Sequence, residues 1–590
     1  MYKSKVANMR MNLFFKKAIL LFTCCLCLFN TATFAQDNQK FQNPILAGFY
    51  PDPAICRVGE DYYLILSSFA YYPGVPIFHS KDLVNWNQIG NILDRPEQLN
   101  LDGHRVTRGI FAPTLSYHDG ICYMVTTLID RGGNFVVTAT NPAGPWSNPV
   151  WLRDVHGIDP SLFFDDDGKA YIIYNGDAPD NKPQYDGHRT IRMQEFDYKN
   201  LRTTSSPTIL VNGGVDLSKK PVWIEGPHLY KKDGYYYLMA AEGGTSVNHS
   251  EVILRSQKVD GEYIPYPGNP ILTQRHLPAN RKNPVSATGH ADLVQTQNGE
   301  WWAVFLATRP YDLEDHYNIG RETFLAPVAW KDDWPIINPG FEEVQYSYKR
   351  SNLPAGAAPK LPLNGNFTYK EEFNDGKLPL YWLMLRTPRT EWYSLSKPAG
   401  SLTLDVRPET ISGAENPSFI ARRQQHIYGS ASTKMDFKPA SSNEFAGIVA
   451  LQNETHYYTM GKTISNGKEV VQLRKSEKTT GADSSETTVL AEVPLKRKDS
   501  KKPLYLKVDF NAGKYGFYYA SKEGDWKLLQ DNVDGTFLST RVAGGFVGVT
   551  LGMYATSQGK SSNGKATFDW FDYEGNDPIY NTTTDANARE

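Results

Sequence analysis

The first half of the chain repeats one pattern of apolar and polar positions. Each repeat has an apolar strand, a polar turn and an aromatic-rich strand, as in "TLSYHDGICYMVTT" and "HLYKKDGYYYLMAAEGG". Four of the five turns are Asp-Gly or Asn-Gly, the strongest short-range signal of a β-hairpin. The turns recur at intervals of 48–66 residues, near Glu60, Asp119, Asp167, Asp233 and Asn298. Five all-β units of this length, with no long amphipathic helix between them, predict a five-bladed propeller. A β-sandwich would also contain hairpins, but they would not restart at such wide and similar intervals.

The pattern changes after Tyr346. The segment 351–366 is rich in Pro, Gly and Ala, which is typical of a linker. Beyond it, short alternating strands such as "STKMDFK" and "LYLKVDF" continue to about Tyr573 and predict a two-sheet β-sandwich. We therefore expect an all-β chain with a propeller over 36–350, a sandwich over 367–577 and a disordered tail over 578–590.

The first 35 residues have the pattern of a secretory signal peptide. A basic start precedes the apolar run "AILLFTCCLCLF" (18–29), and "TFA" ends in a plausible cleavage site after Ala35. An apolar run of this length is too short to span a bilayer as a stable helix, and a retained anchor is the alternative. We expect an exported protein, periplasmic or secreted, whose mature chain is not inserted in a membrane.

Removal of that segment changes the charge and the cysteine count. The segment carries five basic residues and no acidic ones, so the formal net charge falls from −2 to −7. A negative surface argues against nucleic acid and anionic membranes as partners. Cys56 and Cys122 remain, both in apolar runs, and we interpret them as buried thiols, with a disulfide between them as the alternative.

One position recurs eight residues before each turn. In a propeller the first strand of each blade lines the central channel, so equivalent positions of five blades form a ring at one mouth of it. A rigid or small residue follows closely in each case, in "DPA", "FAP", "DPS", "EGP" and "HAD". The predicted ring consists of Asp52, Phe111, Asp159, Glu225 and His290.

Three carboxyl groups in one ring indicate chemistry. Asp before Pro is a common turn starter, which is the alternative for Asp52 or Asp159 taken alone. Clustered carboxylates repel and raise one another's pKa, which is costly unless it is used. Hydrolysis of a glycosidic bond needs one carboxyl group to protonate the leaving oxygen and a second to activate water or attack directly. Glu225, with a longer arm among apolar neighbours, suits the acid; Asp52, between two prolines, suits the base; Asp159 would tune them.

The chain resembles glycoside hydrolase family 43 over roughly residues 41–345. The resemblance is carried by "NPILAGFYPDPAI", "YYPGVPIFHSKDLVNW", "GIDPSLFFDDDGKAY", "WIEGPHLYKKDGYYYL" and "TGHADLVQT". It implies an inverting enzyme that acts on arabinose- and xylose-containing glycans, with Asp52 as general base, Asp159 as pKa modulator and Glu225 as general acid. The second half resembles the concanavalin-like, jelly-roll module that follows the propeller in exo-acting members of the family.

The resemblance implies four further site residues. Phe69 matches a position that packs on the terminal sugar, with a core residue as the alternative. Phe111 stands where tryptophan is expected, which keeps the stacking wall. Arg309 matches an arginine that contacts the sugar and the modulating carboxylate, with a structural salt bridge as the alternative. His290 matches a histidine at the propeller axis, often near a bound cation, and a hydrogen-bonded core histidine is the alternative.

A structural calcium ion is a separate expectation. The acidic segments "KEEFND" (370–375) and "FDWFDYEG" (568–575) lie at the two ends of the second domain and could meet on adjacent strands to bind calcium. Surface charge is the alternative. The hydrolysis itself requires no cofactor.

The predicted function is exo-acting, inverting release of terminal α-L-arabinofuranosyl or β-D-xylosyl groups from oligosaccharides of plant hemicellulose. The alternatives are an endo-acting arabinanase and a non-catalytic glycan-binding propeller, and the intact trio of acids argues against the second. Retaining fructosidases of the same propeller type would place Cys after the acid/base Glu, where this chain has Gly226. The two pentoses place similar hydroxyls around the same carboxylates, so both stay open, as does the oligomeric state.

Overall fold

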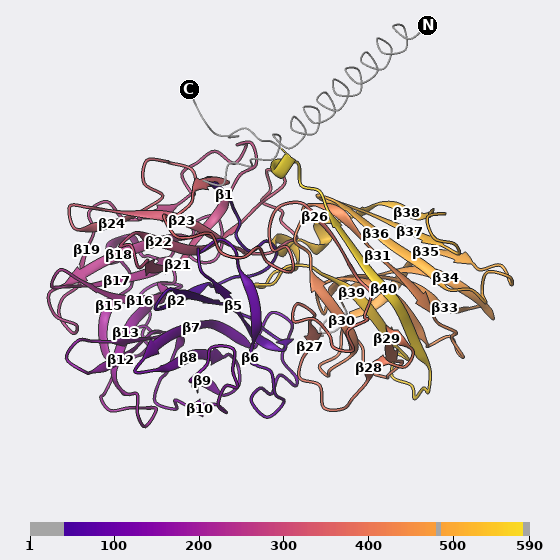
Figure 1. The fold of residues 1–590 in the computed structure, drawn as a ribbon, viewed down its shortest axis with the longest axis horizontal. Coiled ribbons are helices and arrows are strands. Elements are labelled where there is room, and N and C mark those ends of the chain that lie inside the picture. Colours follow the sequence, from indigo (N-terminus) through magenta and orange to yellow (C-terminus); the bar gives the residue numbers. More distant parts are fainter. Residues whose placement is uncertain (1–39, 479–484, 582–590) are drawn as a thin grey trace, which may run out of the picture.

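The protein consists of two all-β domains that lie side by side (Figure 1). The structure is a computed structural model that describes residues 40–478 and 485–581. The predicted signal peptide, residues 1–35, lies outside this range. In the described part of the chain, no helix is long and apolar enough to cross a membrane. The all-β prediction, a propeller followed by a sandwich, is confirmed.

The first domain contains five antiparallel sheets whose strands follow one another in chain order. The first strands of neighbouring sheets touch one another in turn, and β2 contacts both β7 and β21, which closes a five-membered ring around the axis. Each sheet is therefore one propeller blade with its first strand innermost. The blades comprise, in order, β2 (Ala54–Val58), β3 (Asp61–Ile65), β5 (Gly74–Ser80) and β6 (Asn87–Leu93); β7 (Ile110–His118), β8 (Ile121–Leu128), β9 (Gly133–Ala139) and β10 (Val150–Trp151); β11 (Ile158–Phe164), β12 (Ala170–Asp177), β13 (Arg189–Asp197), β14 (Arg202–Thr203) and β15 (Thr208–Asn212); β16 (Glu225–Lys232), β17 (Tyr235–Glu242), β18 (Ser250–Ser256), β19 (Ile264–Pro265) and β20 (Leu272–Thr273); β21 (Ser286–Gln295), β22 (Trp301–Thr308), β23 (Glu322–Lys331) and β24 (Trp334–Ile337).

The turn chemistry of the repeats explains the hairpins. Asp119 and Gly120 join β7 to β8 with φ angles of 49° and 82°, and Asp233 and Gly234 join β16 to β17 with 50° and 82°. Two consecutive positive φ angles define the type I′ turn, whose twist matches that of the paired strands. Asp-Gly sequences favour this turn because both residues tolerate the left-handed region.

The ends of the propeller domain are tied together. The short strand β1 (Lys40–Gln42) pairs with β25 (Ser347–Lys349). The predicted linker then runs over the propeller surface, where the backbone N–H of Gly356 donates a 2.7 Å hydrogen bond to Asp82. The segment is therefore attached to the first domain along its course.

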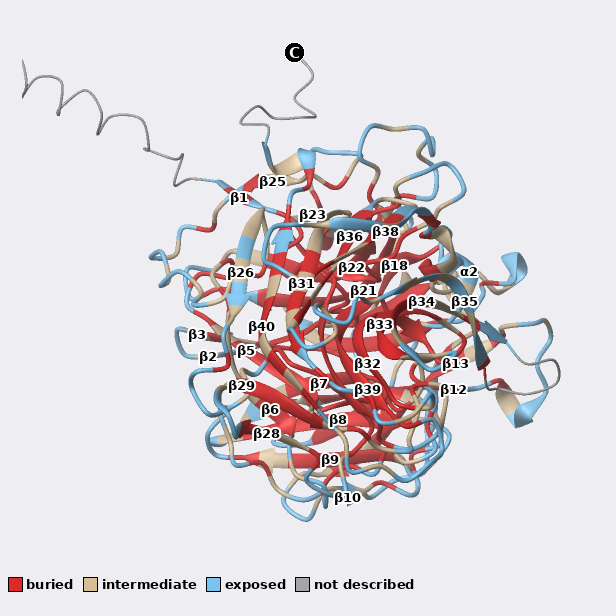
Figure 2. Ribbon diagram, turned by 90° about the vertical axis from the view of Figure 1, so that its right-hand side faces the viewer, coloured by how far each residue is buried: buried red, intermediate tan, exposed pale blue. Residues whose placement is uncertain are grey.

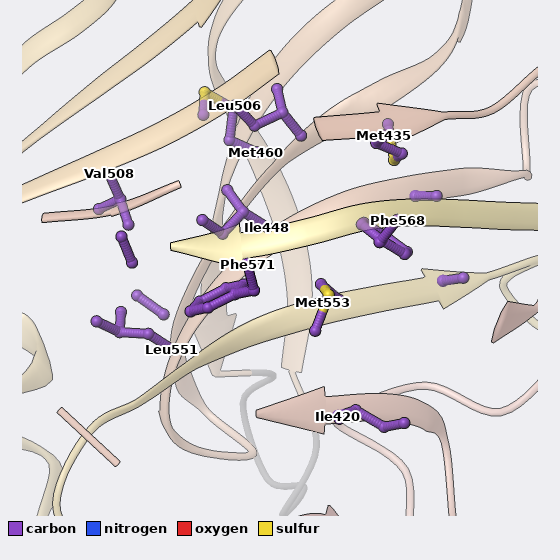
Figure 3. Close-up of a cluster of buried hydrophobic side chains, with 14 of the residues drawn as sticks. Ile420, Met435, Ile448, Met460, Leu506, Val508, Leu551, Met553, Phe568 and Phe571 are labelled. Carbon is purple, nitrogen blue, oxygen red and sulfur yellow. The ribbon is translucent and has the colours of Figure 1, made fainter. Parts of the chain in front are cut away.

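The second domain is a sandwich of two antiparallel sheets. Figure 3 shows its core, where Ile448 and Met553 of one sheet meet Phe568, Phe571 and Leu506 of the other. Hydrophobic residues alternate along the facing strands, so each sheet buries one face. The larger sheet contains β26 (Phe367–Glu371), β28 (Tyr393–Ser396), β29 (Ala399–Asp405), β31 (Tyr428–Asp436), β36 (Leu504–Asn511), β37 (Lys514–Ala520), β38 (Lys527–Asp534) and β40 (Lys565–Gly575), and the smaller contains β30 (Ser418–Arg423), β32 (Phe445–Asn453), β33 (His456–Ser465), β34 (Lys468–Lys478), β35 (Ser485–Pro494) and β39 (Thr550–Thr556).

An extensive contact joins the two domains. Strand β4 (Tyr71–Tyr72) of the propeller pairs with β27 (Met384–Leu385) of the second domain. A single cluster of hydrophobic side chains crosses the boundary, including Phe49 and Phe69 on one side and Phe419 on the other. Figure 2 shows buried residues along the strands and exposed ones in the connecting loops. The sandwich is thereby held against the propeller.

Short helical segments occur in the connections and at the end of the described chain. They are η1 (Pro179–Asn181), η2 (Leu217–Lys219), η3 (Thr536–Leu538), α2 (Thr540–Ala543) and η4 (Pro578–Asn581). The tail was predicted to be disordered from residue 578, but residues 578–581 form η4, and the Tyr580 ring centroid lies 5.7 Å from Cζ of Arg309. The start of the predicted tail was therefore wrong, because Tyr580 packs onto a buried arginine; residues 582–590 lie outside the described range.

The two cysteines are free thiols. Cys122 is buried and Cys56 is half-buried, and burial raises the pKa of Cys122 to about 11. Both groups therefore stay protonated at neutral pH, and the alternative of a disulfide does not hold.

Candidate active site

The five predicted ring residues line one cavity at the mouth of the central channel. The cavity has a volume of about 720 Å³, in the range of about 300–1,000 Å³ that is usual for small-molecule sites. Phe69 also lines it, so six of the seven predicted site residues meet there. The exception is Arg309.

An unusual backbone aims the ring residues into the cavity. Asp52, Asp159 and His290 have left-handed φ angles of 54°, 54° and 51°, and in the other two blades Ala112 and Gly226, which follow the ring residue, have 32° and 57°. The pairing of the first two strands shifts register at this point in the second to fifth blades. Such bulges redirect a side chain. Left-handed non-glycine residues cost about 1–3 kcal/mol each and gather at functional sites.

Asp52 is anchored through both carboxylate oxygens. Oδ1 accepts a 2.7 Å hydrogen bond from Nη1 of Arg321, and Oδ2 accepts a 2.5 Å hydrogen bond from Oγ of Ser67. The backbone N–H of Ala112 in turn donates to Ser67. Burial acts to raise the pKa of Asp52, but the Arg321 charge and the Ser67 hydrogen bond hold it below its ordinary value. Asp52 is therefore ionised at neutral pH.

The pKa values of Asp159 and Glu225 are raised, whereas that of Asp52 is lowered. Burial, followed by the charge of Asp52, raises the pKa of Asp159 to about 7, although the N–H of Gly226 hydrogen-bonds to it. Burial, followed by the charges of Asp159 and Asp52, raises the pKa of Glu225 well above its ordinary value. Glu225 therefore holds a proton at a pH at which Asp52 has none.

His290 lies beside Asp52 as a neutral imidazole. Its Nδ1 is 3.9 Å from Oδ1 of Asp52, and burial lowers its pKa to about 4. A Cβ at Gly226 would lie 2.9 Å from the His290 ring, so glycine after Glu225 permits this close packing. Glu251 accepts a 2.9 Å hydrogen bond from the backbone N–H of Ala291, which holds the His290 turn.

Aromatic rings form one wall of the cavity. Phe111 lies edge-on to Phe69 and to Phe546, with centroid distances of 5.6 Å in both pairs. Phe546 comes from the sandwich domain, where Gly544 and Gly545 (φ 71° and 82°) turn the chain after α2. Its backbone N–H donates a 2.6 Å hydrogen bond to Oγ1 of Thr107. The second domain therefore completes the active-site wall.

Arg309 does not lie where the resemblance placed it. Its guanidinium is buried and pairs with Glu322 at 2.6 Å and with Asp577 at 2.8 Å. It lines a different cavity, of about 350 Å³, between the propeller and the second domain. The expected contact with the sugar and Asp159 was therefore wrong, and the structural salt bridge is what the structure shows. Of these two arginines of the last blade, Arg321, at the head of β23, is the one that lines the active-site cavity.

Several residues that line the cavity were not among the predicted site residues. They come from outer strands, from loops and from the second domain: Arg108, Arg189, Trp223, Arg321 and Phe546. Trp223 alone had a usable signal, since it stands two residues before Glu225 in "PVWIEGPHL". The others are brought in by tertiary contacts between segments far apart in the chain.

The acidic segments of the second domain do meet on adjacent strands, since Lys370 of β26 faces Asp572 of β40. Glu371 accepts hydrogen bonds from the Phe373 backbone N–H and from Tyr381. Among the residues that the structure describes, no group of three or more His, Cys, Asp or Glu side chains could hold a metal ion. The expected calcium site between these two segments is therefore not supported, whereas a metal contact of His290 stays a prediction.

The arrangement provides the two groups that hydrolysis of an acetal requires. An ionised, doubly anchored carboxylate can take a proton from water, and a protonated carboxyl group can give one to a leaving oxygen. Environments that drive the pKa values of two carboxyl groups apart define which is acid and which is base.

Both domains match known protein families. Residues 41–335 match glycosyl hydrolases family 43, and residues 370–574 match the concanavalin A-like domain found at the C-terminus of beta xylosidases. A xylosidase/arabinosidase from Butyrivibrio fibrisolvens is 40% identical, with 90% of this chain and 99% of that protein covered. A non-reducing end alpha-L-arabinofuranosidase from Bacteroides ovatus is 38% identical, with 91% and 95% covered.

Solved structures have the same architecture. The xylan beta-1,4-xylosidase of Bacillus halodurans C-125 superimposes with a TM-score of 0.81 at 33% identity, covering 90% of this chain and all of that one. The GH43B protein of the Bacteroides ovatus xyloglucan PUL gives 0.79 at 38% identity, covering 90% of this chain and 99% of that one.

Proposed function

The chain belongs to glycoside hydrolase family 43, and we propose that it is an inverting, exo-acting glycosidase that releases terminal α-L-arabinofuranosyl or β-D-xylosyl groups from oligosaccharides of plant hemicellulose. The observation that carries the proposal is that the buried carboxyl groups of Asp52 and Glu225 line one cavity, where Asp52 is hydrogen-bonded to the Arg321 guanidinium.

Each carboxyl group has a separate task in the proposed reaction. Asp52 takes a proton from a water molecule, whose oxygen attacks the anomeric carbon. Glu225 gives its proton to the glycosidic oxygen as that bond breaks, so the departing sugar leaves as an alcohol. Asp159 raises the pKa of Glu225 and keeps it protonated. The products are a free pentose and a shortened saccharide, and no cofactor takes part.

The shape of the cavity supports release of terminal units. Phe69, Phe111 and Phe546 make an aromatic wall that limits the size of the terminal sugar. Phe546 comes from the second domain and closes this side of the cavity. A substrate chain can therefore extend away from the wall but not past it. An endo-acting arabinanase needs an open groove, and the wall argues against that alternative.

Kinetics on a matched set of nitrophenyl glycosides test the proposal. We expect measurable kcat/KM on the α-L-arabinofuranoside, the β-D-xyloside or both, and at least about 100-fold less on the β-D-glucoside, because a hexose is larger than either pentose by one CH2O unit and the aromatic wall closes the cavity. Linear arabinan, assayed in parallel, should give monosaccharide only. Oligosaccharide products, or no hydrolysis of any pentoside, would contradict the proposal.

Export is part of the proposal. The basic start, the apolar run 18–29 and the end in "TFA" support cleavage after Ala35, and secretion or a periplasmic location follows. N-terminal sequencing of protein recovered outside the cytoplasm of an expressing bacterium should begin at Gln36. A full-length protein retained in the membrane fraction would support an anchor instead.

A further inference from the structure

A second hollow adjoins the active-site cavity. It has a volume of about 520 Å³ and is lined by residues 177–189 and Trp223. Arg189 and Trp223 line both cavities, so these two side chains form the partition between them. None of the residues that carry out the proposed reaction lies in the second hollow.

The partition is a rigid structure. The Cζ atom of Arg189 lies 4.9 Å from the centroid of the Trp223 ring, over its face. Asn175 accepts hydrogen bonds from Nε and Nη2 of Arg189, at 2.9 and 2.6 Å, and donates to the carbonyl of Ile224 at 2.5 Å. The backbone N–H of Trp223 donates to Gly187 at 2.8 Å, and its φ is 59°. A large aromatic ring is thus held in place although 36% of it is exposed.

The floor of the hollow carries groups that suit a saccharide. Tyr185 and His188 stack with a centroid distance of 4.8 Å and an interplanar angle of 14°. Both are fixed from below, since Tyr185 donates to the carbonyl of Gly213 at 3.0 Å and His188 contacts Oδ1 of Asn212 at 2.7 Å. Side chains able to hydrogen-bond hydroxyl groups surround the aromatic pair: Asp177, Asn181, Gln184, Asp186 and Arg189. Aromatic faces with few convergent polar groups are typical of small-molecule sites.

The position of the proton donor shows which part of the substrate lies on the side of the hollow. A side-chain hydrogen bond joins Trp223 to Glu225. The leaving oxygen must lie within hydrogen-bond reach of Glu225, so the departing sugar begins beside Trp223. The aromatic wall of Phe69, Phe111 and Phe546 instead lies toward the second domain. A chain that extends from the departing sugar would then pass the partition and reach the hollow.

The rim around the partition is apolar and exposed. Val222, which lines the active-site cavity, is 45% exposed, and Gly187 packs against it closely enough that a Cβ would come within 2.9 Å. Exposed apolar groups beside a polar hollow offer surface for the flat faces of sugar rings.

We infer that the hollow beyond Trp223 binds the leaving-group saccharide past its first sugar unit, so that the preferred substrates carry at least two sugars after the scissile bond. The inference rests on the proposed function, since it concerns the same active site. Tyr185 and Asp186 are then specificity-determining residues that act only on longer substrates.

Hydrolysis as a function of substrate length tests this assignment. For the wild-type enzyme, kcat/KM should rise about tenfold from the disaccharide to the trisaccharide of β-1,4-linked xylose or α-1,5-linked arabinose, whichever pentose is cleaved. Tyr185→Ala should reduce the ratio of trisaccharide to nitrophenyl-pentoside kcat/KM about tenfold. Asp186→Ala, at an exposed position, should reduce the same ratio in the same direction. Tyr117→Ala removes an exposed tyrosine that lines neither cavity, and it should leave the ratio unchanged.

The outcomes separate the two proposals. If wild-type enzyme cleaves no pentoside of any length, the proposed function fails. If it cleaves them but kcat/KM does not depend on length, or if Tyr185→Ala and Asp186→Ala lower all substrates by one factor, the assignment of the hollow fails while the function stands. Should Tyr185→Ala unfold early in thermal melts, Asp186→Ala alone decides.

Discussion

Nη1 of Arg321 donates a 2.7 Å hydrogen bond to Oδ1 of Asp52 between two buried side chains. Arg321 stands at the head of β23, the third strand of the last blade, whereas Asp52 precedes β2 in the first. The bond therefore crosses the seam where the propeller closes. Because a cationic partner favours the ionised form of a carboxyl group, this contact keeps Asp52 able to act as a base.

Replacement of Arg321 by Met should move the acidic limb of the kcat/KM profile. Asp52 works as a base only when ionised, which is above its pKa, and loss of the cation raises that pKa. We expect the limb to move to higher pH by about 1–3 pH units. Arg321→Lys keeps the charge and should move the limb less. A profile of unchanged shape in Arg321→Met would show that Arg321 does not act through Asp52; thermal melts check for the destabilisation that follows when a buried pair is broken.

Asp159→Asn should move the alkaline limb in the opposite sense. Glu225 works as an acid only when protonated, which is below its pKa, and the charge of Asp159 raises that pKa. Without this charge the pKa of Glu225 falls, so activity is lost at a lower pH than in the wild-type enzyme. The pH dependence of kcat on a nitrophenyl pentoside measures the limb. An alkaline limb in its wild-type position, with near-normal kcat, would make Asp159 a turn residue.

Glu225→Gln should discriminate between leaving groups. A natural disaccharide leaves as an alcohol that needs a proton, so kcat should fall by about 100- to 10,000-fold. Nitrophenolate is a far better leaving group and needs little protonation, so the loss on the nitrophenyl pentoside should be smaller. Glutamine has the shape of glutamate, so the variant should leave the packing of Gly226 against the His290 ring intact. Equal losses on both substrates would remove Glu225 from the acid role.

The hairpin turns made the ring of five positions predictable. Each turn between the first two strands of a blade lies about eight residues from the mouth of the channel, so counting back from Glu60, Asp167 and Asp233 finds Asp52, Asp159 and Glu225 without knowledge of their neighbours. The count holds although the first strands range from 5 residues in β2 to 10 residues in β21, because it runs from the hairpin turn to the mouth of the channel and does not depend on where a strand begins. The left-handed backbone of Asp52 and Asp159 was not predictable, since Asp tolerates that region but does not require it.

Residues that reach the site from other elements escaped the sequence pattern. Arg309 and Arg321 both lie in the last blade, in "ATRP" and "GRET", and nothing local distinguishes the one that enters the cavity. The difference arises from Glu322 and Asp577, which bind Arg309 elsewhere. Phe546 reaches the site from the second domain through the contact between domains, which alternation of apolar and polar residues does not reveal.

Phe546→Ala should relax the choice of terminal sugar. The ring packs against Phe111 and against the Arg321 guanidinium, and it closes the cavity toward the second domain. Its removal opens space for a sugar larger than a pentose, so KM for the pentoside should rise about tenfold while the ratio of hexoside to pentoside kcat/KM increases.

Phe341→Ala is the matched control for that variant, because Phe341 is 55% exposed and lines neither the active-site cavity nor the hollow beside it. It should leave KM and the sugar preference unchanged. If Phe546→Ala behaves in the same way, the sandwich supports the propeller without shaping the site.

The stereochemistry of the first product follows from how Asp52 is held. A nucleophile must approach the anomeric carbon until a covalent bond forms, whereas a base needs only to touch a water molecule between itself and the sugar. Asp52 is fixed at both oxygens, by Arg321 from the last blade and by Ser67, and Pro51 and Pro53 restrict its backbone. It therefore cannot advance without loss of a buried hydrogen bond, which costs about 1–3 kcal/mol or more for a charged group.

We expect inversion: the first sugar released should be β-arabinose from an α-arabinofuranoside, or α-xylose from a β-xyloside. Proton NMR in the first minutes, before mutarotation, distinguishes the anomers. Release of the substrate's own anomer would mean that Asp52 attacks the sugar directly. The hydrogen bonds from Arg321 and Ser67 would then not keep Asp52 away from the anomeric carbon.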